Sequence, residues 1–66
     1  MIVHVNDEPR DVPEGTSIAE LLARLDVNRG HVAVEVNFEI VPRAMHGERI
    51  LAAGDRLEVV TLVGGG

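Results

Sequence analysis

The sequence contains no cysteine, lysine, tryptophan or tyrosine, and its single aromatic residue is Phe38. Without cysteine, the chain can form neither a disulfide nor a thiolate metal site, and it has no thiol nucleophile. One aromatic ring provides no platform on which successive bases could stack. The net charge of -5 is also opposite to the basic footprint that binding to phosphate backbones requires. These absences argue against a nucleic-acid partner.

Long hydrophobic runs are absent as well. No apolar stretch approaches the roughly 20 residues needed to cross a bilayer, and no basic-then-apolar signal stands at the N-terminus. We therefore expect a cytoplasmic protein with no membrane partner. His4, His31 and His46 are scattered without a ligand spacing, so no metal site is expected. A single domain of 66 residues is also too small to enclose a catalytic pocket, which argues against an enzyme.

The clearest local signal among the residues present is that of a helix. Ser17 and Glu20 have the spacing of a capping box, in which each side chain accepts a hydrogen bond from the other residue's backbone amide. Glu20 also precedes Arg24 by four positions, the favourable order for a surface ion pair. The pattern predicts a helix from residue 18 to about 25 or 26, terminated by residues 28–30. One apolar stripe follows the helical spacing: Ile18, Leu21, Leu22 and Leu25.

Short β-rich segments flank this helix. Residues 2–12 have the composition of a hairpin closed by turn-forming residues. Residues 32–36 alternate as a half-buried strand and are followed by a turn at 37–39. Pro42 then indicates that the strand at 40–41 is short and lies at a sheet edge. The remaining segments are an irregular stretch or single turn at 43–49, an apolar insertion into the core at 50–51, a tight turn at 53–55 and a last strand at 56–63.

This order of elements predicts an α+β fold of the β-grasp type, a mixed sheet of four or five strands packed on one main helix. The first and last strands would form a parallel central pair, which the helical crossover makes possible. Residues 1–63 would make up this domain and residues 64–66 a flexible tail. Phe38, at a turn tip, is either a lid on the core or an exposed contact, and the lid is the favoured interpretation. The expected core is Val3, Val5, Ile18, Leu21, Leu22, Leu25, Val34, Val36, Leu51, Leu57 and Val59.

The tail Gly64-Gly65-Gly66 directly follows the last predicted strand. Glycine has no side chain to pack, so these residues add nothing to the core, but they form a slim peptide that could carry a carboxylate into a narrow channel. A frayed, functionless terminus is the alternative interpretation. Val60 and Leu62 should point away from the core near this tail. With the acidic Glu58, they are the candidate docking residues for a partner.

Taken in order, these features resemble the ThiS-type sulfur carriers of thiamine biosynthesis. These are ubiquitin-like proteins related to the MoaD-type small subunits of molybdopterin synthase. The resemblance covers essentially the whole chain, and Gly64 is a third glycine at a position where the family varies. The segments that carry it are Val5-Asn6, Thr16 to Asp26, Val36-Asn37, Ile40-Val41-Pro42-Arg43, Gly54-Asp55 and Gly65-Gly66.

The resemblance implies a carrier protein without bound cofactor, not an enzyme. An E1-like adenylyltransferase of the ThiF type would use ATP and Mg²⁺ to activate the Gly66 carboxylate. Sulfur would then replace AMP and leave a thiocarboxylate, while Gly64 and Gly65 thread the partner's channel. The acceptor would be a thiazole synthase of the ThiG type.

Two other functions remain open. The first is a MoaD-type carrier for molybdopterin synthesis, which uses the same terminal chemistry. The short chain and residues 40–43 favour the thiamine group. The second is a ubiquitin-like protein modifier or a plain interaction module. A modifier without lysine could not form lysine-linked chains on itself.

Overall fold

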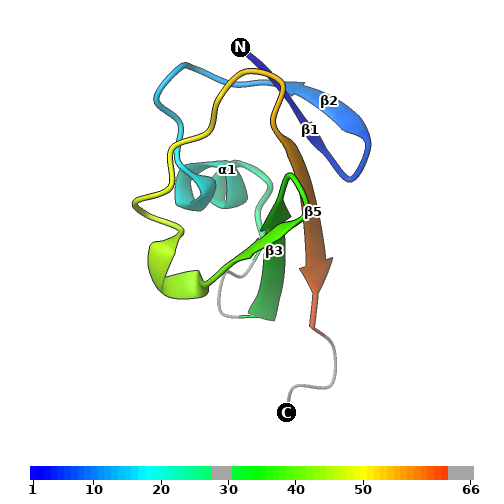
Figure 1. Ribbon diagram of the computed structural model, residues 1–66, viewed down its shortest axis with the longest axis vertical. Coiled ribbons are helices and arrows are strands. Elements are labelled where there is room, and N and C mark those ends of the chain that lie inside the picture. The colour runs from blue at the N-terminus through cyan, green and yellow to red at the C-terminus, as the bar shows by residue number, and fades with distance from the viewer. Residues whose placement is uncertain (28–30, 63–66) are drawn as a thin grey trace.

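The structure is a computed structural model that describes residues 1–27 and 31–62. Figure 1 shows one helix lying against one side of a curved sheet. The five strands are hydrogen-bonded in the order β2-β1-β5-β3-β4. The elements are β1 (Ile2–Val5), β2 (Glu8–Asp11), α1 (Ile18–Arg24), β3 (Val32–Val36), β4 (Glu39–Val41), the 3-10 helix η2 (Arg43–Met45) and β5 (Arg56–Thr61).

The pairing of the strands confirms the predicted α+β β-grasp fold. β1 and β5 are parallel neighbours at the centre of the sheet, and every other pair is antiparallel. β4 is short and lies at an edge, as the proline after it indicated. The last strand ends at Thr61, and residue 63 of its predicted span lies outside the described residues. The division into a domain at 1–63 and a tail at 64–66 also falls on such residues and stays a prediction.

Helix α1 begins with the predicted capping box. Ser17 Oγ accepts from the Glu20 amide at 3.1 Å, and Glu20 Oε1 accepts from the Ser17 amide at the same distance. A further free amide of the first turn, that of Ala19, donates to the carbonyl of His46 at 2.9 Å. The N-terminal turn is therefore tied both to its own cap and to the segment after η2, which satisfies donors that a helix leaves unpaired.

The predicted surface pair between Glu20 and Arg24 is wrong. These two side chains form no ion pair, because the Glu20 carboxylate turns back to the Ser17 amide and is no longer available one turn further on. The helix ends at Arg24, with Leu25 as its C-cap. Its predicted termination by residues 28–30 lies outside the described residues.

The core between α1 and the sheet contains all the predicted residues, although Leu25 and Val59 are only partly buried against it. Ile50 is also an exception to the expected apolar insertion, because it is half exposed while Leu51 is buried. Three further valines that the expected core did not include are buried: Val12, Val32 and Val41. Of these, only Val32 belongs to the alternation predicted for residues 32–36.

The predicted role of Phe38 as a lid on the core is wrong, because its side chain is 84% exposed. It occupies the second central position of the turn between β3 and β4, with a φ of 70°. The turn between β1 and β2 has the same form, with positive φ at Asn6 and Asp7. Both are type I′ turns, which match the twist of the flanking strands and point their central side chains away from the sheet.

Replacing Phe38 by glycine should therefore stabilise the fold. Glycine adopts positive φ without steric strain, so we expect the free energy of unfolding to rise by about 1 kcal/mol. Urea denaturation measures this change. Phe38→Leu is the matched control, since it keeps a large side chain in the same backbone conformation and should change stability little. A clear loss of stability in Phe38→Gly would show that the ring supports the fold after all.

Candidate functional site

The candidate site is the surface around the end of β5, the strand that leads toward the glycine tail. Leu57 on this strand is buried in the core and Val59 is partly buried. The side chains of the residues between and after these two point to the opposite face of the sheet. Val60 and Leu62 are 54% and 53% exposed, and Glu58 is exposed beside them. The predicted exposure of these side chains is confirmed, whereas their role in docking stays a prediction.

The side chain of Asn6 holds β5 from the side of β1. Its Oδ1 accepts from the Val59 amide at 2.8 Å, and its Nδ2 donates to the Val59 carbonyl at 3.1 Å. β1 has already turned away at this point, so the amide group of Asn6 extends the strand pairing beyond the backbone of β1. Asparagine suits the position because it tolerates the left-handed conformation and supplies both a donor and an acceptor.

Asn37, in the equivalent turn between β3 and β4, holds the beginning of β5. Its side-chain Oδ1 accepts from the Arg56 backbone amide at 3.0 Å, and its backbone amide donates to the Arg56 carbonyl at 2.7 Å. Its Nδ2 also donates to Asp55 Oδ1 at 3.0 Å. Two turn asparagines thus fix β5 from its two sides. The sequence marked both as turn residues, but nothing in the local pattern indicated that their side chains reach the last strand.

The face of the sheet opposite α1 has exposed apolar and acidic side chains; we call it the outer sheet face. On it, Glu35 of β3 stands directly opposite Glu58 of β5, a like-charge pair that disfavours the sheet. Ile40 of β4 is opposite Glu35 and is 75% exposed. Ala33 is opposite Val60. The outer sheet face therefore combines exposed apolar side chains with two neighbouring carboxylates, and sequence reasoning identified neither Glu35 nor Ile40.

The chain leaves the sheet at Leu62, whose amide donates to the carbonyl of His31 at 2.7 Å. This hydrogen bond continues the pairing of β5 with the segment before β3 to the last described residue. The predicted sulfur-carrying and threading residues, Gly66, Gly64 and Gly65, lie outside the described residues. The structure therefore describes the base of the predicted tail and the surface around it.

The histidines and acidic residues do not gather into a metal-binding group anywhere in residues 1–27 and 31–62. His46 is buried, and its Nε2 lies 3.0 Å from the carbonyl of Val41, to which it must donate because a carbonyl only accepts. Its Nδ1 has no partner. This side chain ties η2 to the end of β4. In the described part of the chain, no helix has the length and hydropathy of a membrane span.

The chain is similar to known proteins in both sequence and fold. The model of the ThiS family matches residues 3–66. The sulfur carrier protein ThiS of Escherichia coli is 30% identical over the full length of both chains. A crystal structure of the thiamine biosynthesis protein ThiS from Geobacter metallireducens superposes with a TM-score of 0.84, at 33% identity and complete coverage of both chains.

Longer proteins match as well. The thiazole synthases of Paramagnetospirillum magneticum and Magnetococcus marinus are each 39% identical, over 94% and 100% of this chain respectively. The chain spans only about a fifth of the length of these two relatives, 19% and 20%. The family model, the full-length relative and the fold agree, and the chain belongs to the ThiS family.

Proposed function

We propose that this protein is a sulfur carrier that delivers sulfur for thiazole formation in thiamine biosynthesis. The observation that carries the proposal is the match to the E. coli sulfur carrier protein over the full length of both chains. The glycine tail and the absence of cysteine fit this function, because the sulfur would be held by the end of the backbone and not by a side chain.

The chemistry acts on the carboxylate of Gly66. A carboxylate is a poor acylating agent, so a partner adenylyltransferase first joins it to the AMP part of ATP and releases pyrophosphate. Sulfide from a sulfur donor then attacks the acyl carbon, the bond to AMP breaks, AMP leaves, and a thiocarboxylate remains. ATP and Mg²⁺ belong to the partner enzyme. Gly64 and Gly65 keep the approach to that centre narrow, because they have no Cβ and restrict φ little.

The folded domain contributes recognition and positioning to this scheme. Asn6 and Asn37 hold β5 from both sides, so the strand that leads toward the tail has a fixed place in the sheet. The exposed apolar residues Val60 and Leu62 and the carboxylate of Glu58 surround that place. A partner that receives the tail meets this surface first, and a partner surface with apolar and basic groups would complement it.

The acceptor of the sulfur is a thiazole synthase in this proposal. Two relatives named thiazole synthase contain a segment similar to this chain within a much longer polypeptide. A carrier joined to the enzyme it serves is held at a high effective concentration, which supports a functional pairing between the two activities.

The proposal is tested by incubating the protein with the adenylyltransferase, ATP and a sulfur source and then measuring its intact mass. The mass should show one oxygen exchanged for sulfur, and fragmentation should locate the exchange at Gly66. The product is then mixed with thiazole synthase and its substrates, and separately with the large molybdopterin synthase subunit and its pterin precursor. Turnover in the second mixture alone would reject the thiamine assignment but not the carrier chemistry.

Docking through the outer sheet face predicts that Leu62→Asp weakens binding to the adenylyltransferase. The change places a charge in the apolar part of the surface, so we expect an increase in Kd of about tenfold or more. Isothermal titration calorimetry measures it. Ile50→Asp is the matched control, because Ile50 is 51% exposed, close to the 53% of Leu62, but lies outside the sheet. Equal losses in both variants would remove Leu62 from the docking surface.

A further inference from the structure

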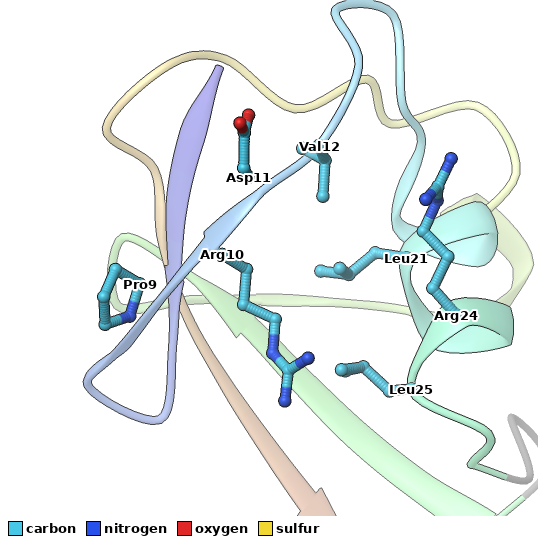
Figure 2. Close-up of a pocket in the computed structure, with 7 residues that line it drawn as sticks. All are labelled: Pro9, Arg10, Asp11, Val12, Leu21, Arg24 and Leu25. Atoms are coloured by element: carbon cyan, nitrogen blue, oxygen red, sulfur yellow. The ribbon is translucent and has the colours of Figure 1, made fainter.

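A cavity of about 340 Å³ lies between β2 and α1, apart from the outer sheet face. Figure 2 shows the residues that line it, which come from the two elements and the segment directly after β2. Its volume is at the lower end of the roughly 300–1,000 Å³ typical of small-molecule sites. Nothing in the sulfur-carrier function described above uses this cavity.

Arg10 of the edge strand β2 points to the side of the sheet on which α1 lies, with its side chain 46% exposed. It stands directly opposite Val3, which is fully buried, and directly opposite residues of an antiparallel pair point to the same face. An apolar side chain at this position would fill the space between β2 and α1. The position is occupied instead by a guanidinium group, and a cavity remains.

A charged inward residue can also protect an edge strand from pairing with another chain. That explanation does not extend to the second arginine of the cavity, Arg24, because it is on α1 and has no strand edge to protect. Glu8, Pro9 and Asp11 already give β2 the charges and the proline that discourage such pairing.

Among the described residues, neither guanidinium group is in hydrogen-bonding contact with a carboxylate, and the one ion pair, between Arg10 and Glu8, is long and exposed. The carboxylate nearest to Arg10 is that of Glu8, at 3.9 Å, and Arg24 forms no ion pair within residues 1–27 and 31–62. The one acidic residue that lines the cavity, Asp11, has its carboxylate 3.2 Å from the amino nitrogen of Met1. In a chain with a net charge of -5, the cavity thus has a local excess of positive charge.

The two arginines and the apolar surface between them indicate the chemical class of ligand that the cavity would bind. Figure 2 shows their guanidinium groups well apart, that of Arg10 beside Leu25 and that of Arg24 on the other side of Leu21. Val12 and Leu21 are buried core residues, and Leu25 is partly buried. We propose that this cavity binds a small organic dianion with two acidic groups joined by an apolar chain. Each guanidinium would bind one acidic group.

A series of linear dicarboxylates of increasing length, from succinate to sebacate, tests the proposal. Binding is followed by amide and arginine side-chain shifts in NMR spectra at constant ionic strength. Affinity should pass through a maximum at one chain length, and that dicarboxylate should bind about tenfold more tightly than the monocarboxylate of equal length. Arg10→Gln and Arg24→Gln should each reduce the dicarboxylate to the affinity of the monocarboxylate.

Arg43→Gln is the matched control, because Arg43 is exposed on η2 and does not line the cavity. It should leave both affinities unchanged. An affinity that does not depend on chain length, or equal losses in all three variants, would mean that the anions interact only with the overall charge and would overturn the site. The sulfur exchange at Gly66 is measured separately, so failure of either proposal leaves the other standing.

Discussion

Deleting Gly66 should abolish sulfur loading and leave the fold unchanged. The deletion moves the carboxylate one residue back, so it no longer reaches the reactive centre of an adenylyltransferase that holds the domain in place. We expect no detectable oxygen-to-sulfur exchange in the intact mass. The melting temperature should not change, because the core that the structure describes is formed by residues from Met1 to Val59. A lost melting transition would contradict the structural independence of the tail.

A point substitution separates steric demand from chain length. Gly66→Ala keeps the length but adds a methyl group beside the carboxylate, and we expect loading to slow by about tenfold or more. Gly47→Ala is the matched control, since no atom beyond the adjacent residues lies within 4 Å of the methyl group it would add. It should load at the normal rate. Normal loading of Gly66→Ala would mean that the partner's channel tolerates a side chain.

Leu57→Ala should cause the largest loss of stability of any single truncation on β5. Leu57 is 1% exposed and stands in register with Val5 of β1 and Val36 of β3, so the removed atoms leave a cavity that neighbouring strands cannot fill. We expect the free energy of unfolding to fall by about 3 kcal/mol. In a domain of this size that is a large fraction of a total of roughly 5 kcal/mol.

The loss is measured by urea denaturation with both far-UV circular dichroism and amide NMR as probes. Val60→Ala on the same strand is the matched control: Val60 is 54% exposed and should lose less than about 0.5 kcal/mol. Similar losses in the two variants would mean that the inward and outward faces of β5 do not differ as the structure describes.

The element order and most of the core could be predicted from the sequence because both rest on local periodicity. The apolar stripe of α1 and the alternation of β3 each state which side chains share a face. The burial of Val41 was not predicted, because the adjacent Pro42 indicated only that the strand lies at an edge. Val41 is buried and pairs with Val34 of β3. Burial at a sheet edge depends on the neighbour strand, which local sequence does not contain.

The errors at Phe38 and Glu20 have a different origin. Phe38 was expected to cover the core from its turn, yet hydrophobicity does not decide the direction of a side chain in a type I′ turn. Glu20 satisfied two local patterns at once, and the capping hydrogen bond excluded the ion pair. The role of Asn6 in holding β5 involves residues 53 positions apart, so the local pattern could not reveal it.

The parallel arrangement of β1 and β5 has a mechanical consequence. The amides of His4 and Asn6 donate to the carbonyls of Asp55 and Leu57 across this pair, and β3 is hydrogen-bonded along the other side of β5. A force that pulls the chain along the axis of β5 beyond Leu62, while β1 is held, shears these bonds together instead of opening them one by one. A partner that draws on the tail therefore meets the stiffest direction of the domain, and the strand should stay in register under the load.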